Sequence, residues 1–278
     1  MSSKSPIGVF DSGVGGLSVA RQFMRLLPSE SLLYFADTAH VPYGGRPLDE
    51  VRGFALSITD YLIRSGAKMV VMACNISSAV ALDEARKLYP KTPILGVIVP
   101  GVQAAVKQGG RRLGVLATQG TVSSGAYTRA AANLAPNAVV TEVPCPRFVP
   151  LIEAGKTETV EALNAARAYL EPLSRASCDT IILGCTHYPF LINALSHEAR
   201  DLFSADCLPR FVDPAQETVR EAAAVLADRS AVAPAGELAC HRYFTSADPD
   251  AVGDQIEAFL GSRIDGCNHV SLDPARLS

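Results

Sequence analysis

Two apolar segments of this chain end in a cysteine at the point where a helix begins. The run Lys68–Ala73 leads into Cys74, and the run Ile181–Gly184 leads into Cys185. Short apolar runs bounded by turn residues are typical of strands buried on both faces, as in parallel sheets covered by helices. We therefore expect an α/β protein in which both thiols lie at the carboxyl ends of strands, where such sheets bind their ligands.

The same alternation of strand and helix runs along the rest of the chain. The predicted strands are Ile7–Asp11, Ser31–Asp37, Lys68–Ala73, Ile94–Val99, one within Arg111–Gly125, Ala138–Val143, Ile181–Gly184, Arg210–Asp213 and Leu238–Thr245. The predicted helices are Leu17–Leu27, Leu48–Arg64, Ser77–Tyr89, Val102–Lys107, Ser124–Leu134, Thr157–Ser174, Pro214–Asp228 and Pro249–Leu260, with a further helix opened by Pro189. The tail from Arg263 is predicted to be irregular. This alternation favours mostly parallel, doubly wound sheets.

The chain also shows a weak internal repeat. The opening PIGVFDSGVGGLS and the later RRLGVLATQGTVSSG each give a strand, a Ser or Thr past its end, glycines and a helix; Gly8 matches Gly114, and Ser12 matches Thr118. The cysteine-bearing strands follow at nearly the same interval. Any two βα units look partly alike, but cysteines at matching positions in both halves favour a duplication. We expect two pseudosymmetric domains whose thiols face each other across a cleft as a pair of acid–base groups.

Composition and charge exclude several classes of protein. With 278 residues, 48% of them hydrophobic and 19% charged, the chain can bury a substantial core and is not expected to be disordered. A net charge of −3 and a pI near 6.0 give no general attraction to nucleic acid or to an anionic membrane. No apolar run reaches membrane-spanning length, no signal-peptide core is present, and seven scattered cysteines suit a reducing compartment. We expect a cytoplasmic protein.

The two thiols are the candidate reactive groups. The dipole of a helix favours a thiolate at its start, so we expect the pKa of both thiols to fall from about 8.5 toward neutrality. His187, two residues after Cys185, can orient or protonate that thiol. Asp11, at the end of the first strand, is either a helix cap or a partner of Cys74, and Glu153 is a weaker candidate. Five other cysteines are expected to be small hydrophobic residues: Cys145, Cys178, Cys207, Cys240 and Cys267.

Three other kinds of site are poorly supported by the sequence. Cys74, Cys185 and His187 lack the spacing of structural zinc ligands and leave a further ligand missing, so no metal is expected. The turn SGVGG does not complete a G-x-G-x-x-G fingerprint, because Ser18 occupies the last position, and no P-loop lysine follows. No Cys-x-x-Cys is present for thiol–disulfide exchange.

Four motifs in order along the chain resemble those of the glutamate racemase family. They are DSGVGGLS (Asp11–Ser18), DTAHVPYG (Asp37–Gly44), ACNISSA (Ala73–Ala79) and LGCTHYPFL (Leu183–Leu191). The resemblance implies an enzyme that interconverts L- and D-glutamate without a cofactor and supplies D-glutamate for bacterial peptidoglycan. It also implies a first domain of residues 1–98 with 210–278, a second domain of residues 99–209, glutamate bound between them, and a homodimer.

The resemblance also assigns roles to individual residues. Cys74 would take the α-proton of D-glutamate and Cys185 that of L-glutamate, each returning a proton to the opposite face. Asp11 would assist Cys74, and His187 would assist Cys185. The substrate-binding residues that it implies are Asp11, Ser12, Pro42, Tyr43, Gly44, Asn75, Thr118, Thr121, Glu153, Thr186 and His187. None of the six lysines lies where a Schiff base is expected, which agrees with a reaction that needs no pyridoxal cofactor.

One position departs from the family pattern. The family has Thr after Cys-Asn, whereas this chain has Ile76, so a hydroxyl contact to the substrate is absent there. The backbone N–H of Ile76 or the hydroxyl of Ser77 can replace it. Two other interpretations stay open: an aspartate racemase of the same superfamily, which carries Glu in place of His187, and a non-catalytic, two-lobed amino-acid-binding protein.

Overall fold

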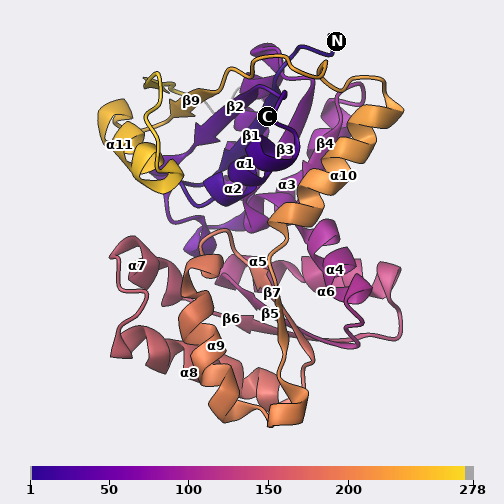
Figure 1. Ribbon diagram of the computed structural model, residues 1–278, viewed down its shortest axis with the longest axis vertical. Coiled ribbons are helices and arrows are strands. Elements are labelled where there is room, and N and C mark those ends of the chain that lie inside the picture. Colours follow the sequence, from indigo (N-terminus) through magenta and orange to yellow (C-terminus); the bar gives the residue numbers. More distant parts are fainter. Residues whose placement is uncertain (1, 273–278) are drawn as a thin grey trace. The chain divides into compact units, whose positions relative to one another are not determined.

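The computed structural model describes residues 2–272. By their backbone contacts these residues form two compact units, one of residues 2–97 with 218–272 and one of residues 98–217 (Figure 1). Residue 1 and residues 273–278, which the sequence assigned to the first domain, lie outside the described part. No helix among residues 2–272 combines the length and apolar character needed to cross a membrane.

The first unit is built on a parallel sheet with the strand order β10-β9-β2-β1-β3-β4 (Figure 1). Its strands are β1 (Ile7–Asp11), β2 (Leu32–Ala36), β3 (Met69–Met72), β4 (Ile94–Gly96), β9 (Arg242–Thr245) and β10 (Cys267–His269). Every residue of β1 to β4 is buried, because helices cover both faces of the sheet. This burial accounts for the continuous apolar runs in the sequence.

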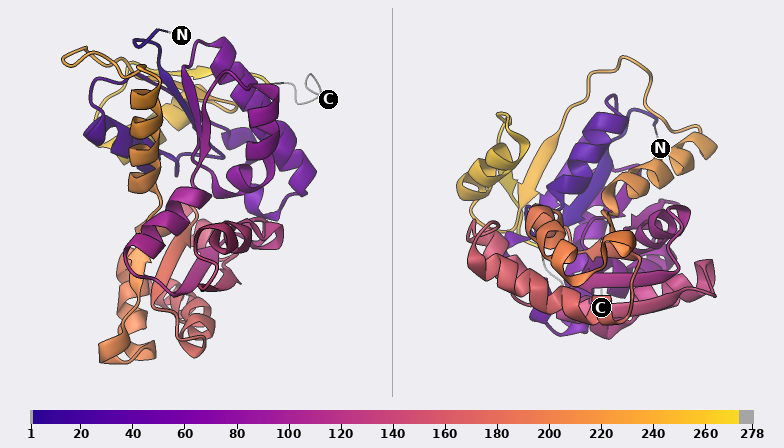
Figure 2. Two further views of the ribbon diagram at one scale, coloured as in Figure 1. Left: turned by 90° about the vertical axis from the view of Figure 1, so that its right-hand side faces the viewer. Right: turned by 60° about the horizontal axis from the view of Figure 1, so that its bottom comes forward.

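The helices of this unit lie on the two faces of its sheet. They are α1 (Leu17–Leu26), α2 (Leu48–Arg64), α3 (Asn75–Leu88), most of α10 (Ala215–Asp228) and α11 (Pro249–Leu260), with short 3₁₀ turns at Thr38–His40 and Tyr43–Gly45. Helices α2 and α3 pack together on one face, and α1 packs with α11 on the other (Figures 1 and 2).

The second unit is built on a parallel sheet with the order β6-β5-β7-β8. Its strands are β5 (Arg112–Ala117), β6 (Val139–Pro144), β7 (Thr180–Gly184) and β8 (Arg210–Val212). Its helices are α4 (Ile98–Lys107), α5 (Gln119–Ser124), α6 (Ala126–Leu134), α7 (Phe148–Glu153), α8 (Val160–Arg175) and α9 (Ile192–Leu202), with 3₁₀ turns at Tyr188–Leu191 and Ala205–Cys207. Helices α8 and α9 pack together, as do α4 and α6 (Figure 1).

Local signals delimit several helices as expected from capping rules. Thr159 caps α8 by accepting a hydrogen bond from the N–H of Ala162 (3.3 Å). Helix α11 has Asp248 as its N-cap and Pro249 at its first position, and it ends at Gly261, where φ is +71°.

The internal repeat is visible in the sheets. Strand β1 lies between β2 and β3, and β5 lies in the same way between β6 and β7. On β1, Gly8 has Leu62 of α2 above it; on β5, Gly114 has Leu173 of α8 in the corresponding place. The predicted α/β fold with two doubly wound, parallel-sheet domains is confirmed.

Some elements differ from those expected. The sequence placed residues from 210 onward in the first domain, but β8 pairs with β7 and so belongs to the second sheet. The tail expected to be irregular contains β10, and α7 occupies part of an expected loop. The helix expected at Pro189 is a 3₁₀ turn followed by α9. The elements that the sequence did not indicate, β10 and α7, are short and lack a clear periodicity.

Candidate active site

Cys74 lies beside Asp11 at the carboxyl edge of the first sheet. The N–H of Ala73 donates to the carbonyl of Phe10 (2.9 Å), so the residues that follow β1 and β3 lie next to each other. Asp11 is fully buried, and its Oδ2 accepts a hydrogen bond from the N–H of Gly16 (3.0 Å). A β-carbon at Gly16 would lie 2.4 Å from that of Asp11, so this turn needs glycine.

The pKa of the Cys74 thiol is raised, which contradicts the expectation of a value near neutrality. Burial raises this pKa most, and the negative charge of Asp11 adds to it, giving a value of about 11. The hydroxyl and N–H of Ser77 and the N–H of Ser12 act in the opposite direction, as donors that favour a charged sulfur. Cys74 is the N-cap residue of α3, but the dipole of the helix does not outweigh desolvation here. The thiol is therefore protonated in the ligand-free protein.

A loop that follows β2 packs against the Cys74 side. Asp37, the residue directly after β2, is buried and accepts hydrogen bonds from the phenol of Tyr43 and, at 2.8 Å, from Nδ1 of His40. Tyr43 belongs to the same apolar cluster as Cys74 and Ile76. The loop is thus fixed by a carboxylate that the sequence did not single out as a site residue, although its position at a strand end was a usable signal.

The other residues predicted to bind substrate in the first unit lie on the same elements as Cys74 and Asp11 or on the loop after β2. Asn75 is buried as the first residue of α3, and Ser12 is half-buried in the turn after β1. Pro42 is exposed and Gly44 is half-buried, on either side of Tyr43. Tyr34 was missed, because nothing distinguishes it within an apolar strand; its phenol donates to the carbonyl of Gly13 (2.7 Å) and so fixes the turn after Asp11.

Cys185 lies at the corresponding edge of the second sheet, where the imidazole of His187 lies between its sulfur and the carboxylate of Glu153. Its Sγ is 3.8 Å from Nδ1 of His187, and Nε2 of His187 is 3.7 Å from Oε1 of Glu153. Cys185 and His187 are buried, while the Glu153 side chain is 47% exposed at the end of α7. An imidazole between a thiol and a carboxylate can pass a proton to or from the sulfur.

The two predicted threonines of this unit pair with each other. Thr118 Oγ1 and Thr121 Oγ1 are 3.0 Å apart at the start of α5. Because Ala117 of β5 lies opposite Gly184 of β7, Thr118 and Cys185 follow neighbouring positions of the sheet. Thr186 is buried directly after Cys185. The sequence missed Tyr127, which is fully buried and packs against Gly184; burial and then the charges of Glu142 and Cys185 raise its pKa.

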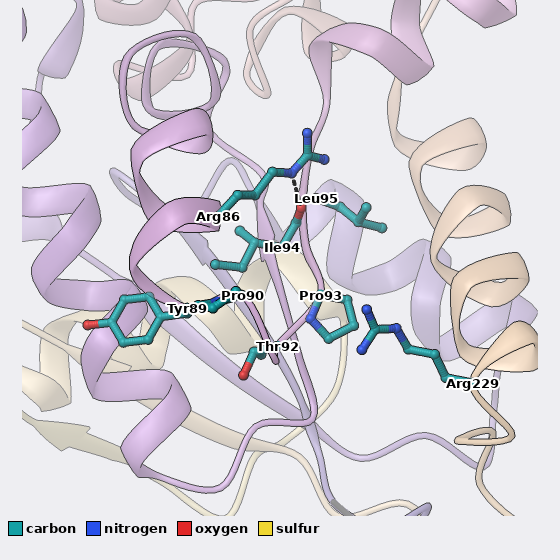
Figure 3. Close-up of a pocket in the computed structure, with 8 residues that line it drawn as sticks. All are labelled: Arg86, Tyr89, Pro90, Thr92, Pro93, Ile94, Leu95 and Arg229. Atoms are coloured by element: carbon teal, nitrogen blue, oxygen red, sulfur yellow. Dashed lines mark hydrogen bonds between the residues drawn. The ribbon is translucent and has the colours of Figure 1, made fainter.

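A pocket of about 260 Å³ in the first unit contains none of these residues (Figure 3). It lies where β4 begins, at the edge opposite the strand end that precedes Cys74, and two guanidinium groups border it. Arg86 donates from Nε to the carbonyl of Ile94 (2.9 Å), and Arg229 donates to that of Lys91 (3.2 Å). Across residues 2–272, no three His, Cys, Asp or Glu side chains come together as metal ligands would.

Comparison with known proteins identifies the family. Residues 7–222 match the Asp/Glu/Hydantoin racemase family. A glutamate racemase from Microcystis aeruginosa is 45% identical over 260 residues, which cover 94% of this chain and 89% of that protein. A glutamate racemase isoform from Bacillus anthracis is similar in structure with a TM-score of 0.89 and 32% identity, covering 97% of this chain and 98% of that one. The structure of glutamate racemase from Francisella tularensis in complex with D-glutamate gives a TM-score of 0.88 and 30% identity, covering 98% and 99%. The resemblance carried by the four motifs is confirmed, and the chain belongs to the Asp/Glu/hydantoin racemase family.

Proposed function

We propose that this protein interconverts L- and D-glutamate by a two-base mechanism in which Cys74 and Cys185 act on opposite faces of the α-carbon. The observation that carries the proposal is the repeated position of the two thiols: Cys74 follows β3, which pairs with β1, and Cys185 follows β7, which pairs with β5. Glutamate is the substrate named for the relatives in both sequence and structure. Inversion of a stereocentre by deprotonation needs a base on one face and an acid on the other, and two such thiols supply both.

The proton transfers balance in each direction. From D-glutamate, the Cys74 thiolate takes the α-proton, and the electron pair of the C–H bond stays on the substrate as a carbanion. The Cys185 thiol then gives its proton to the opposite face, which leaves L-glutamate, a Cys74 thiol and a Cys185 thiolate. Burial and Asp11 disfavour the Cys74 thiolate that this direction needs, so groups that stabilise the thiolate favour the reaction.

Neighbouring groups would assist each thiol in its own way. We propose that Asp11 acts on the Cys74 side and that His187, oriented by Glu153, transfers protons on the Cys185 side. The substrate carboxylates and ammonium would be held by Ser12, Asn75, Thr118, Thr121 and Thr186, by Asp11 and by the Pro42–Gly44 segment. Backbone N–H groups at helix starts favour anionic groups such as the substrate carboxylates.

The wider role follows from the same proposal. We propose that the reaction proceeds without a cofactor, in the cytoplasm, by a homodimer, and that it supplies D-glutamate for peptidoglycan. Growth of a D-glutamate-requiring bacterial strain on expression of this chain, without added D-glutamate, is the expected result. Failure to restore growth despite racemase activity in the extract would remove the biosynthetic role alone.

Isotope exchange tests the reaction itself. The extensively dialysed protein is incubated with L-glutamate in deuterium oxide, with no cofactor added, while optical rotation and α-deuterium are followed. We expect optical rotation to be lost and early deuterium to appear mainly in the D-enantiomer, because a two-base enzyme delivers a solvent-derived deuteron to the face opposite the one it deprotonates. Turnover of aspartate instead of glutamate would assign another substrate, and absence of any turnover would overturn the proposal.

A further inference from the structure

Two adjacent serines in the first turn of α3 have different surroundings. The hydroxyl of Ser78 donates to the carbonyl of Met72 (2.8 Å) and accepts from the N–H of Val97 (3.3 Å), so it fastens the start of α3 to the first sheet. The Ser77 hydroxyl is fully buried and has no hydrogen-bond partner of ordinary geometry among residues 2–272. A buried hydroxyl without a partner is unfavourable, so its retention calls for an explanation.

The position of Ser77 in the helix directs its side chain toward Cys74. Cys74 is the N-cap residue of α3, with φ −68° and ψ 124°, and Ser77 is the third helical residue after it. In a capping box a longer Glu or Gln side chain at this third position reaches back to the backbone of the N-cap residue, so the shorter Ser77 side chain starts from the same place. Ser77 can therefore present its hydroxyl to the cysteine without leaving the helix.

Apolar side chains form part of the surroundings of the Cys74 sulfur. The apolar cluster around it contains Tyr43, Val51, Phe54 and Ile76. Tyr43 directs its phenol to Asp37, and Ile76 has no donor in its side chain. A negative charge on the sulfur, already opposed by burial and by Asp11, is therefore favoured by any donor that reaches the sulfur.

We propose that Ser77 is a positioning residue whose hydroxyl turns toward the Cys74 sulfur and stabilises its thiolate. In the neutral thiol form this hydroxyl stays without a good partner, and it gains one when the sulfur is charged. Hydrogen bonding from Ser77 lowers the pKa of Cys74, in agreement with this arrangement. The effect on catalysis rests on the proposed function, in which Cys74 is a base, but the contact itself does not.

Alkylation of Cys74 tests the contact without using the reaction. The intact protein and its Ser77→Ala variant are treated with iodoacetamide at pH 8.5, and modification of Cys74 is measured by peptide mass spectrometry. At this pH the rate follows the small thiolate fraction, and loss of one hydrogen bond to a charged group should lower that rate about tenfold. An unchanged rate would overturn the proposal.

Two further measurements separate this role from a structural one. Ser77→Ala removes a hydroxyl that has no partner in the resting protein, so we expect its Tm to be unchanged or raised. Ser57→Ala, which removes a buried hydroxyl bonded to the carbonyl of Gly53 (2.9 Å), is the matched control and should leave Cys74 alkylation unchanged. A large fall in the Tm of Ser77→Ala would show a structural hydroxyl and would overturn the proposal.

Racemase kinetics show which of the two proposals fails. If Ser77→Ala slows both alkylation and racemisation about tenfold, both proposals are supported. If alkylation slows while racemisation does not, the contact is supported and Cys74 is not the rate-limiting base. Because the rates in both directions are linked by an equilibrium constant of one, the variant should lower kcat/KM equally for both enantiomers.

Discussion

The two halves of the chain share a framework but surround their cysteines with different groups. In both halves one strand carries a glycine beneath a packed helix, and a cysteine follows the strand that pairs with it. Cys74 lies near Asp11, a fully buried carboxylate held by backbone N–H groups. Cys185 lies near His187, whose other nitrogen faces the half-exposed Glu153. The framework thus determines where each thiol lies, whereas the charged groups beside each thiol differ between the halves.

Replacing each cysteine is the strongest way to test this comparison. Cys74→Ser and Cys185→Ser should each lower racemisation by about 10²–10⁴-fold, because in the proposed mechanism each variant lacks a proton-transfer group on one face. In deuterium oxide, Cys185→Ser should still exchange the α-proton of D-glutamate, and Cys74→Ser that of L-glutamate. Exchange followed by NMR, with Cys207→Ser as the exposed control, provides the measurement. Equal exchange of both enantiomers in either variant would contradict the assignment of one thiol to each face.

The starts of the two cysteine-bearing strands differ in a way that affects stability. Before β3, Lys68 forms an ion pair with Glu30 (2.6 Å), and the two side chains are only 1% and 2% exposed. At the matching place before β7, Asp179 accepts hydrogen bonds from the N–H groups of Arg111 and Arg112 (both 3.0 Å). Leaving a buried charge without its partner costs about 3–5 kcal/mol. Losing one of the hydrogen bonds between a backbone N–H and Asp179 costs about 1 kcal/mol.

Denaturant unfolding of variants at these two positions checks the difference. Lys68→Met should lower the free energy of unfolding by about 3–5 kcal/mol, and Asp179→Ala by about 1–2 kcal/mol. The double variant Lys68→Met with Glu30→Leu should recover part of the loss, because the second change removes the uncompensated carboxylate. A loss in Lys68→Met no larger than that in Asp179→Ala would show that the buried pair does not stabilise the first unit.

The matched glycines offer a closer comparison. A β-carbon on Gly8 would lie 3.1 Å from Cβ of Leu62, and one on Gly114 would lie 2.9 Å from Cδ1 of Leu173. The Cδ1 methyl group of Leu173 can rotate away, whereas Cβ of Leu62 moves only with helix α2. Both Gly8→Ala and Gly114→Ala should therefore destabilise by about 1–3 kcal/mol, with the larger loss in Gly8→Ala. Thermal unfolding measures the two losses of stability. A larger loss in Gly114→Ala would show that α8 shifts less easily than α2 to make room for the added methyl group.

Much of this framework was predictable from the sequence. Buried parallel strands have continuous apolar runs, so the strands that end before Cys74 and Cys185 were found with their cysteines at the carboxyl ends. Gly8 and Gly114 match in the sequence for a physical reason, because a helix packs closely above each of them. Short elements such as β10 were missed, because three residues carry no readable period.

The protonation of the site was not predictable from local sequence. The start of α3 suggested a lowered pKa for Cys74, but burial and the charge of Asp11 raise it, and both depend on tertiary contacts. The same holds for Asp37, whose bonds to His40 and Tyr43 depend on the course of a loop rich in Gly and Pro. Spacing along the chain identifies candidate groups, whereas their electrostatics follow from packing.

The smallest effect isolates the charge of Asp11. Because this carboxylate raises the pKa of Cys74, Asp11→Asn should lower that pKa below about 11 while its amide oxygen can still accept from the N–H of Gly16. A fall of roughly half to one pH unit corresponds to about three to ten times more thiolate at pH 8.5, and alkylation of Cys74 should speed up accordingly.

His187→Gln serves as the control for this prediction, because it changes the surroundings of Cys185 and should leave the alkylation rate of Cys74 unchanged. Racemisation by Asp11→Asn should nevertheless fall, since in the proposed mechanism the substrate loses a charged partner. Faster alkylation with slower racemisation is therefore the expected combination. Slower alkylation in Asp11→Asn would mean that Asp11 favours the thiolate. The contrast between a carboxylate that opposes charge on Cys74 and a histidine proposed to relay protons for Cys185 would then no longer hold.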